Sequence, residues 1–297
     1  MTELVATLIA RPGNAANLAM ATDHCLDFLD GSSAAELSRG EAVDIAFTGD
    51  KPLPELRAHL QTFVAELPVD IVVQPTAGRR KMLLVADMDS TIIGQECIDE
   101  LADFAGLKEK VAAITERAMR GEIEFEPALR ERIALLKDLP VSAIDRVLSE
   151  RITLDPGARA LIATMRANGA RAILVSGGFT AFVEHIATLV GFNESYSNQL
   201  FETDGRLTGM VGEPILGRTA KLATLEDAII RFGLAVEATM AVGDGANDLA
   251  MIGHAGLGIA YHAKPKVAAA AAARIDHNDL TALLFAQGYR REEFVTS

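Results

Sequence analysis

The stretch LLVADMDSTIIG, residues 83–94, decides the fold, because an apolar run of strand character ends there in two aspartates. Short apolar runs of this kind are typical of central parallel strands that are covered on both faces. Asp87 and Asp89 follow the run directly, and carboxylates beside apolar surroundings are costly unless their charge is compensated. The pair therefore either forms a solvated Asx turn at the end of the strand or faces a positively charged group.

Two further apolar runs, at residues 171–176 and 239–243, have the same character and alternate with amphipathic helical stretches. This alternation predicts βα units and hence an α/β fold, a doubly wound parallel sheet with a Rossmann-like core. In such sheets the ligand site lies beyond the carboxyl ends of the strands. The residues that follow each run are therefore expected to meet in one crevice.

A long insertion interrupts the βα series at about residues 95–154. Its sequence is almost entirely of helical character, which predicts a helical cap, with breaks at Gly106, Gly121 and Pro140. Asp204-Gly205 stands between two short runs of strand character and predicts a hairpin. The alanine run at 268–273 predicts helix throughout.

The first 75 residues predict a separate small unit in the order βαββαβ, a ferredoxin-like α+β domain. This predicted topology resembles the small ligand-sensing ACT domains of amino-acid metabolism. A module for packing, or for dimerisation into a homodimer, is the alternative. Residues 74–81 combine Pro, Gly and three basic residues in a row, as in a linker, so we expect domains at 1–75 and 80–297.

The composition limits the class of protein. The chain has 297 residues, 49% hydrophobic and 23% charged, which predicts an ordinary globular protein of about two domains. Its formal net charge of −13 argues against a nucleic-acid or anionic-membrane partner. Cys25 and Cys97 form no paired motif, and we find no signal peptide and no apolar run of transmembrane length. These features predict a cytoplasmic protein.

The predicted crevice combines acidic side chains with glycines. Asp87, Asp89, Asp244 and Asp248 come from only two strand ends, so their repulsion predicts a divalent cation between them. Ligands that are all oxygen favour Mg²⁺, which usually also takes a phosphate oxygen of the substrate. Ser176 and glycines at 177, 178 and 245 would let hydrogen-bond donors approach an anion closely. The crevice is thus predicted to bind a phosphate.

Four motifs in this order carry a family resemblance: D-x-D-S-T at 87–91, S-G-G at 176–178, Lys221, and G-D-G-x-N-D at 243–248. Together they resemble the haloacid dehalogenase superfamily and, within it, the phosphoserine phosphatases. The resemblance covers roughly residues 80 to 285. Met88 stands where the family usually has Phe, an apolar replacement that we expect to affect packing rather than chemistry.

The resemblance implies a catalytic role for each motif residue. Asp87 would attack the phosphorus and form an aspartyl-phosphate, and Asp89 would protonate the leaving hydroxyl and then deprotonate water. Ser176 and Lys221 would bind the transferring phosphoryl oxygens. The metal would be held by Asp87, the backbone carbonyl of Asp89 and Asp244. Asp248 would be an additional or outer ligand, its alternative role being a carboxylate at a helix N-terminus.

The resemblance also implies a substrate pocket in the cap. Glu96 matches the position that meets an amino group, and Arg132 the position that clamps a carboxylate. Taken alone, they would be an acid at a helix start and a solvated helix arginine. The remaining substrate contacts implied are the apolar walls Met119 and Phe125, and Ser176, Gly177, Lys221 and Asn247 near the phosphate.

These expectations describe a Mg²⁺-dependent hydrolase that converts O-phospho-L-serine to L-serine and phosphate, the last step of serine synthesis. One alternative is a related enzyme that acts on another small phosphate or transfers the phosphoryl group to an acceptor such as homoserine. Another is an amino-acid-sensing regulatory protein in which the phosphatase core is secondary.

Overall fold

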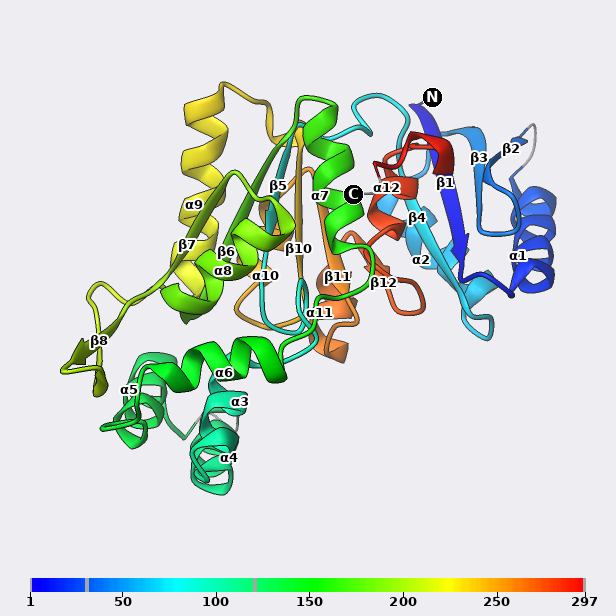
Figure 1. Cartoon of the computed structure of the whole chain (residues 1–297). Helices are drawn as coiled ribbons and strands as arrows, with labels where there is room; N and C mark the ends of the chain where they lie inside the picture. The colour runs from blue at the N-terminus through cyan, green and yellow to red at the C-terminus, as the bar shows by residue number, and fades with distance from the viewer. Residues whose placement is uncertain (1, 30–31, 120–121, 296–297) are drawn as a thin grey trace.

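The computed structural model describes residues 2–29, 32–119 and 122–295, and its N-terminal part is a four-stranded antiparallel sheet with two helices (Figure 1). The elements are β1 (Thr2–Ala10), α1 (Ala15–Phe28), β2 (Ser33–Ser38), β3 (Ala42–Gly49), α2 (Leu53–Val64) and β4 (Val69–Pro75). The strand order is β2-β3-β1-β4, so the predicted ferredoxin-like topology is confirmed. Leu8 of β1, Leu18 of α1 and Leu60 of α2 share one buried cluster, which places both helices on one face of this sheet.

The second sheet has six parallel strands in the order β12-β11-β10-β5-β6-β7. Its strands are β5 (Leu83–Ala86), β6 (Arg171–Phe179), β7 (Glu194–Asn198), β10 (Thr239–Gly243), β11 (Leu257–Tyr261) and β12 (Ala273–Ile275). The helices that follow are α7 (Ala158–Ala167), α8 (Thr180–Val190), α9 (Arg218–Phe232), α10 (Leu249–His254), α11 (Pro265–Ala270) and α12 (Ala282–Ala286), with short 3₁₀ turns at Val236–Ala238 and Arg291–Glu293. The predicted doubly wound α/β fold is therefore confirmed.

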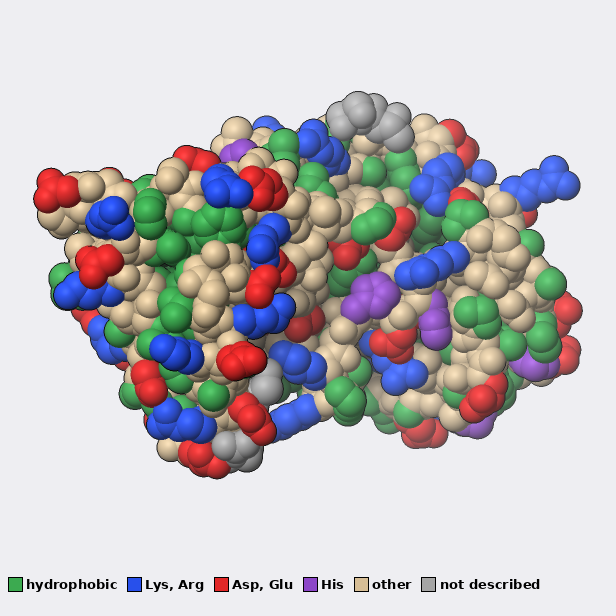
Figure 2. Space-filling model, turned by 60° about the horizontal axis from the view of Figure 1, so that its bottom comes forward, with side chains coloured by type: hydrophobic (Ala, Val, Ile, Leu, Met, Phe, Trp, Pro, Cys, Tyr) green, Lys and Arg blue, Asp and Glu red, His purple; other side chains and the backbone are tan. Residues whose placement is uncertain are grey.

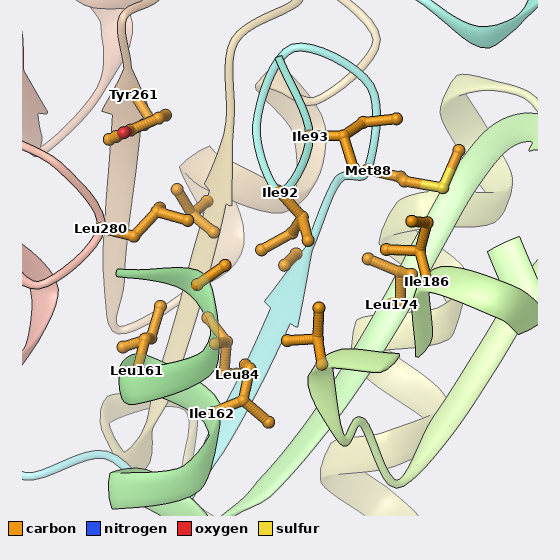
Figure 3. Packing of buried hydrophobic residues seen from close by; sticks show 14 of the residues in the cluster. Leu84, Met88, Ile92, Ile93, Leu161, Ile162, Leu174, Ile186, Tyr261 and Leu280 are labelled. Carbon is orange, nitrogen blue, oxygen red and sulfur yellow. The ribbon is translucent and has the colours of Figure 1, made fainter. Parts of the chain in front are cut away.

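Alternate residues of β5 point to opposite faces of this sheet, and both faces are buried. Leu84 packs in one core cluster with Leu161 of α7 and Leu174 of β6 (Figure 3). Leu83 packs in a second cluster with Leu225 of α9. Burial on both sides explains why the strand is continuously apolar.

The helical insertion lies beyond the carboxyl edge of the parallel sheet (Figure 1). It comprises α3 (Cys97–Phe104), α4 (Lys108–Met119), α5 (Phe125–Leu135) and α6 (Ser142–Glu150). Gly106 and Pro140 fall between these helices, whereas Gly121 lies outside the described residues. The hairpin of β8 (Leu200–Thr203) and β9 (Arg206–Val211) turns at Asp204-Gly205, as predicted, and packs against α5.

The alanine run at residues 268–273 contains the end of one helix and the start of a strand. The prediction of helix along the whole alanine run is wrong, because α11 ends at Ala270 and Ala273 begins β12. Ala273 pairs with Ile259 of β11, so sheet pairing outweighs the helix propensity of alanine there.

Within the described ranges, none of the helices is both long and apolar enough to cross a membrane.

The free face of the N-terminal sheet packs against the parallel-sheet part, where β12 lies beside β4 and α12 beside β1 (Figure 1). Val69, Ile71 and Val73 of β4 belong to the N-terminal core, whereas Val72 belongs to the core of the parallel sheet. Both faces of β4 are therefore buried. The segment after β4 takes part in this contact, because Arg79 donates to the carbonyl of Ala286 over 3.3 Å.

Candidate active site

The carboxyl ends of three neighbouring strands form one crevice. Asp87 follows β5, Ser176 lies near the end of β6 and Asp244 follows β10, and these strands are adjacent in the order β10-β5-β6. The backbone N–H of Asp87 donates to the carbonyl of Val242 over 3.0 Å, which ties two of the strand ends together. Figure 2 shows the side of the molecule on which the cap lies, with acidic and basic side chains interspersed over it.

Three buried carboxylates lie together in the crevice. Asp87, Asp244 and Asp248 each offer one oxygen, and these oxygens lie within 4.8 Å of one another. The Nζ of Lys221 lies 2.6 Å from Oδ2 of Asp87 and 2.6 Å from Oδ1 of Asp248. Lys221 is almost completely buried, so the positive group that the aspartates required is present. One ammonium still leaves the three carboxylates with excess negative charge.

The pKa values of these groups reflect that excess. Burial, and then the charge of Asp87, raise the pKa of Asp248 to about 8, although Lys221 opposes the shift. Burial and the charges of Asp87 and Glu96 raise the pKa of Asp244 to about 6. Burial alone would lower the pKa of Lys221, but Asp87 and Asp248 raise it above its ordinary value. All the candidate ligands are oxygens, so the cluster fits a hard divalent cation.

Asp89 occupies the side of the crevice next to Ser176. Its Oδ1 accepts the backbone N–H of Cys97 over 3.0 Å, and its Oδ2 accepts the hydroxyl of Ser176 over 3.2 Å. Burial and the charges of Glu96 and Asp87 raise the pKa of Asp89 to about 7, although the Cys97 N–H opposes the shift. A carboxyl group with such a pKa can both give and take a proton near neutrality.

Met88 turns away from the crevice into the core. Its side chain is fully buried and packs in the cluster that contains Ile92 and Ile186 (Figure 3). Met88 is therefore a packing residue in this structure, and the effect of having Met in place of Phe stays a prediction. Its neighbours Asp87 and Asp89 consequently both face the crevice side of the turn.

Glycines keep the side of the crevice next to Ser176 open. A side chain at Gly178 would meet both Oδ2 of Asp89 and Oγ of Ser176 at 3.0 Å. The Gly178 N–H donates to Oγ of Ser176 over 2.9 Å. The ring of Phe125, which begins α5 in the cap, lies within 3.5 Å of the position that a Cβ of Gly177 would take. Phe125 therefore walls the crevice from the cap side.

The acidic and basic residues predicted for the substrate lie at the cap side. Glu96 accepts the hydroxyl of Ser90 over 2.9 Å, and burial and the charge of Asp87 are among the causes that raise its pKa. Arg132 lies in α5, where burial lowers its pKa and the charges of Asp99 and Glu96 oppose the shift. The two side chains are therefore close enough to interact electrostatically.

The two remaining predicted substrate contacts are Asn247 and Met119. Asn247 covers Gly245, since any side chain at Gly245 would collide with the amide oxygen of Asn247. Met119 is the last residue of α4, and its side chain lies outside the described part of the structure.

Two polar residues of the crevice were not predicted from the sequence. Lys264 follows β11, and its charge opposes the burial that raises the pKa of Glu96 and of Asp244. Asn198 ends β7 and donates to the carbonyl of Gly177 over 2.9 Å, which ties the end of β7 to the end of β6 next to Ser176. Both residues follow or end a strand of the parallel sheet. The expectation that site residues lie at the carboxyl ends of strands, which we applied to three strands, would have identified them if it had been applied to β7 and β11 as well.

Comparison with known proteins agrees with this site. The family model described as haloacid dehalogenase-like hydrolase matches residues 84–253, which include both aspartate motifs. The fold and the crevice thus define a hydrolase of this class. A crystal structure of a HAD family hydrolase from Salmonella enterica serovar Typhi has 28% identity and a TM-score of 0.86, over 99% of this chain and 100% of that chain.

More specific relatives define the family within this class. Phosphoserine phosphatase SerB2 of Mycobacterium tuberculosis is 45% identical over 240 residues, which are 80% of this chain and 58% of that protein. A solved structure described as a phospho-aspartyl intermediate analogue of phosphoserine phosphatase is 41% identical, over 69% of this chain and 98% of that one, with a TM-score of 0.65. The chain belongs to the phosphoserine phosphatase family of the haloacid dehalogenase-like hydrolases.

Proposed function

We propose that this chain hydrolyses O-phospho-L-serine to L-serine and phosphate through an aspartyl-phosphate on Asp87. The observation that carries the proposal is the arrangement around Asp87: Lys221 lies 2.6 Å from its carboxylate, and Asp89 follows two residues later at the same strand end. A covalent intermediate on an aspartate divides phosphate-ester hydrolysis into two easier displacements. The similar solved structure with a phospho-aspartyl analogue supports this choice.

In the first half-reaction an Asp87 carboxylate oxygen attacks the phosphorus as the bond to the serine oxygen breaks. Asp89 gives its proton to that oxygen, so that serine leaves as the neutral alcohol. In the second half-reaction Asp89 takes a proton from water, which attacks the phosphorus and displaces the Asp87 carboxylate. Lys221, the Ser176 hydroxyl and the N–H of Gly177 stabilise the phosphoryl oxygens during both displacements.

We propose Mg²⁺ as the metal. Asp87, Asp244, Asp248 and the backbone carbonyl of Asp89 would hold it, and when bound it would offset the charge that Asp87 shares with the phosphoryl group. The excess negative charge of the buried carboxylates supports a divalent cation here.

Substrate choice is assigned to the cap. Glu96 would pair with the ammonium group of phosphoserine and Arg132 with its carboxylate, while Phe125 would form an apolar wall and Asn247 would contact the phosphate region. Met119, the other apolar wall that the family resemblance implies, stays a prediction. The electrostatic proximity of Glu96 and Arg132 supports this assignment, because a free amino acid presents both charges within a few bonds.

The test compares hydrolysis of phosphoserine, phosphothreonine and simple phosphate monoesters, with phosphoryl transfer to homoserine measured in parallel. We expect hydrolysis of phosphoserine to dominate. Glu96→Gln and Arg132→Gln should raise KM for phosphoserine far more than KM for a phosphate ester without amino and carboxylate groups. Transfer to homoserine without hydrolysis would contradict the proposed reaction.

The wider setting follows from this reaction. We propose that the enzyme completes serine synthesis in the cytoplasm, which two free, buried cysteines support.

We propose that the domains are residues 1–75 and 80–297, with a cap near 95–154 in the second, and that the first is an ACT-like regulatory unit. A homodimer stays a prediction. If residues 1–75 sense an amino acid and the phosphatase core is secondary, the protein's regulatory function should survive Asp87→Asn.

A further inference from the structure

A buried carboxylate of the N-terminal part organises a loop of the parallel-sheet part. Asp70 lies on β4, is 3% exposed, and points toward the loop that follows β12. It accepts the backbone N–H groups of Asp276 over 2.8 Å, His277 over 3.2 Å and Asn278 over 3.0 Å. The Asn278 amide adds a further hydrogen bond to Asp70 over 2.7 Å. The conformation of residues 276–278 therefore depends on a residue outside the parallel-sheet part.

The same loop holds His262. The Nε2 of His262 donates to the carbonyl of Asn278 over 2.9 Å, since a carbonyl oxygen can only accept. The backbone N–H of His262 donates to the carbonyl of Ile275 over 2.8 Å. His262 has a φ of 42°, a left-handed conformation that a non-glycine residue adopts only where surrounding contacts support it.

His262 lies two residues before Lys264, which belongs to the crevice. Lys264 donates its backbone N–H to the carbonyl of Asp244 over 3.2 Å, and its charge acts on both Glu96 and Asp244. Residues 262–264 thus form a turn with one end on the loop that Asp70 organises and the other end at the candidate active site. Lys264 itself is exposed, so this turn, rather than packing of its side chain, decides its direction.

We propose that Asp70, Asn278 and His262 are positioning residues through which the N-terminal part orients Lys264 toward the anionic substrate. The inference rests on the proposed function, because it concerns the orientation of a cation toward phosphoserine. It assigns to the N-terminal part a role in substrate binding that needs no ligand on that part. Lys264 is the residue that touches the substrate, and the other three act through it.

The test is a double-mutant cycle on the full chain, with hydrolysis of phosphoserine as the readout. His262→Asn keeps a residue type that tolerates positive φ but is too short to reach the Asn278 carbonyl. We expect His262→Asn and Asp70→Asn each to lower kcat/KM about three- to thirtyfold, mainly through KM. In a Lys264→Met background the same substitutions should have almost no further effect.

The matched control is Asp44→Asn, at another buried carboxylate of the same sheet. Asp44 pairs with Arg79 over 2.6 Å and has no bond to residues 276–278. We expect Asp44→Asn to lower thermal stability without changing KM. Because Asp70→Asn can also impair folding, His262→Asn provides the second, local variant.

Two results would overturn the inference. One is a fully additive cycle, in which His262→Asn has the same effect with and without Lys264. The other is an unchanged KM in both His262→Asn and folded Asp70→Asn. Failure of the proposed function is distinguishable, because the unaltered chain would then not hydrolyse phosphoserine at all.

Discussion

The crevice and the interface between the two parts both bury carboxylates, but they compensate the charge differently. In the crevice, Asp87, Asp244 and Asp248 share one ammonium, Lys221, and the pKa values of Asp244 and Asp248 are raised. At the interface, Asp44 has its own guanidinium, and Asp70 accepts four N–H groups along one loop.

This difference separates a site that performs chemistry from one that holds the structure together. Charge left unmatched in the crevice can be matched by a metal ion and a phosphoryl group in the course of a reaction. At the interface each carboxylate already has its ion-pair or hydrogen-bond partners, and these stabilise the folded chain, although burial still raises the pKa of Asp70. Substitutions in the crevice should therefore change turnover most, and those at the interface should change stability most, apart from the effect on KM that Asp70 exerts through Lys264.

The largest effect is expected for Asp87→Asn. The amide cannot act as the nucleophile, so phosphate release from phosphoserine should fall by at least about a thousandfold. Steady-state assays measure the loss, and circular dichroism checks that the fold is intact. Activity within tenfold of the unaltered chain would show that Asp87 is not the nucleophile.

Asp89→Asn should have the next largest effect. Without the proton donor and acceptor, both half-reactions should slow, by about 10²- to 10⁴-fold. A substrate with a good leaving group, such as p-nitrophenyl phosphate, needs no proton in the first step, so its phosphoenzyme formation should be largely spared. Rapid-quench kinetics separates the two steps, and equal slowing for both substrates would contradict the role of Asp89.

Stability should respond with opposite sign in the two regions. Asp44→Asn leaves the guanidinium of Arg79 without its counterion and should lower the free energy of unfolding by about 2 kcal/mol. Asp244→Asn removes an unmatched charge and should raise that free energy in metal-free protein at pH 8 by about 1 kcal/mol. Denaturant unfolding in chelator measures both, and destabilisation of similar size by both substitutions would remove the contrast.

The smallest effect is a pH dependence of stability at Lys81, in the segment that joins the two parts. Burial lowers the pKa of Lys81 from 10.5 to about 8, although the charge of Glu237 opposes the shift. Between these values the unfolded chain binds the extra proton, so stability should rise with pH. Lys81→Met should lack this rise, measured as the difference in unfolding free energy between the two proteins from pH 8 to pH 10. Parallel pH curves for both would contradict the assignment.

Local sequence patterns were sufficient to predict the three central strands of the parallel sheet and the centre of the crevice. The apolar runs before Asp87, Ser176 and Asp244 are strands because burial on both faces requires continuous apolar residues, and parallel strands bring their carboxyl ends to one edge. The ferredoxin-like order of residues 1–75 followed from alternating patterns in the same way.

Long-range contacts were not predictable from those patterns. The short strand β12 begins at the end of an alanine run that predicts helix. It is a strand because it pairs with β11, a contact that local propensity does not reveal. The basic residues Arg79 and Lys81 were predicted to lie in a linker. Arg79 also pairs with Asp44, and Lys81 is 5% exposed and donates to the carbonyl of Glu237. The contacts of Arg79 and Lys81 join residues 35 and 156 positions apart, and only the folded chain brings them together.

The position of the covalent phosphate tests the central claim most directly. The enzyme is quenched in acid during turnover of phosphoserine and digested, and its peptides are examined by mass spectrometry for a phosphate on a carboxylate. We predict one acid-stable, base-labile phosphate on Asp87, absent from Asp87→Asn. A phosphate on another residue, or turnover without any phosphoenzyme when phosphoenzyme hydrolysis is slowed by Asp89→Asn, would contradict the account.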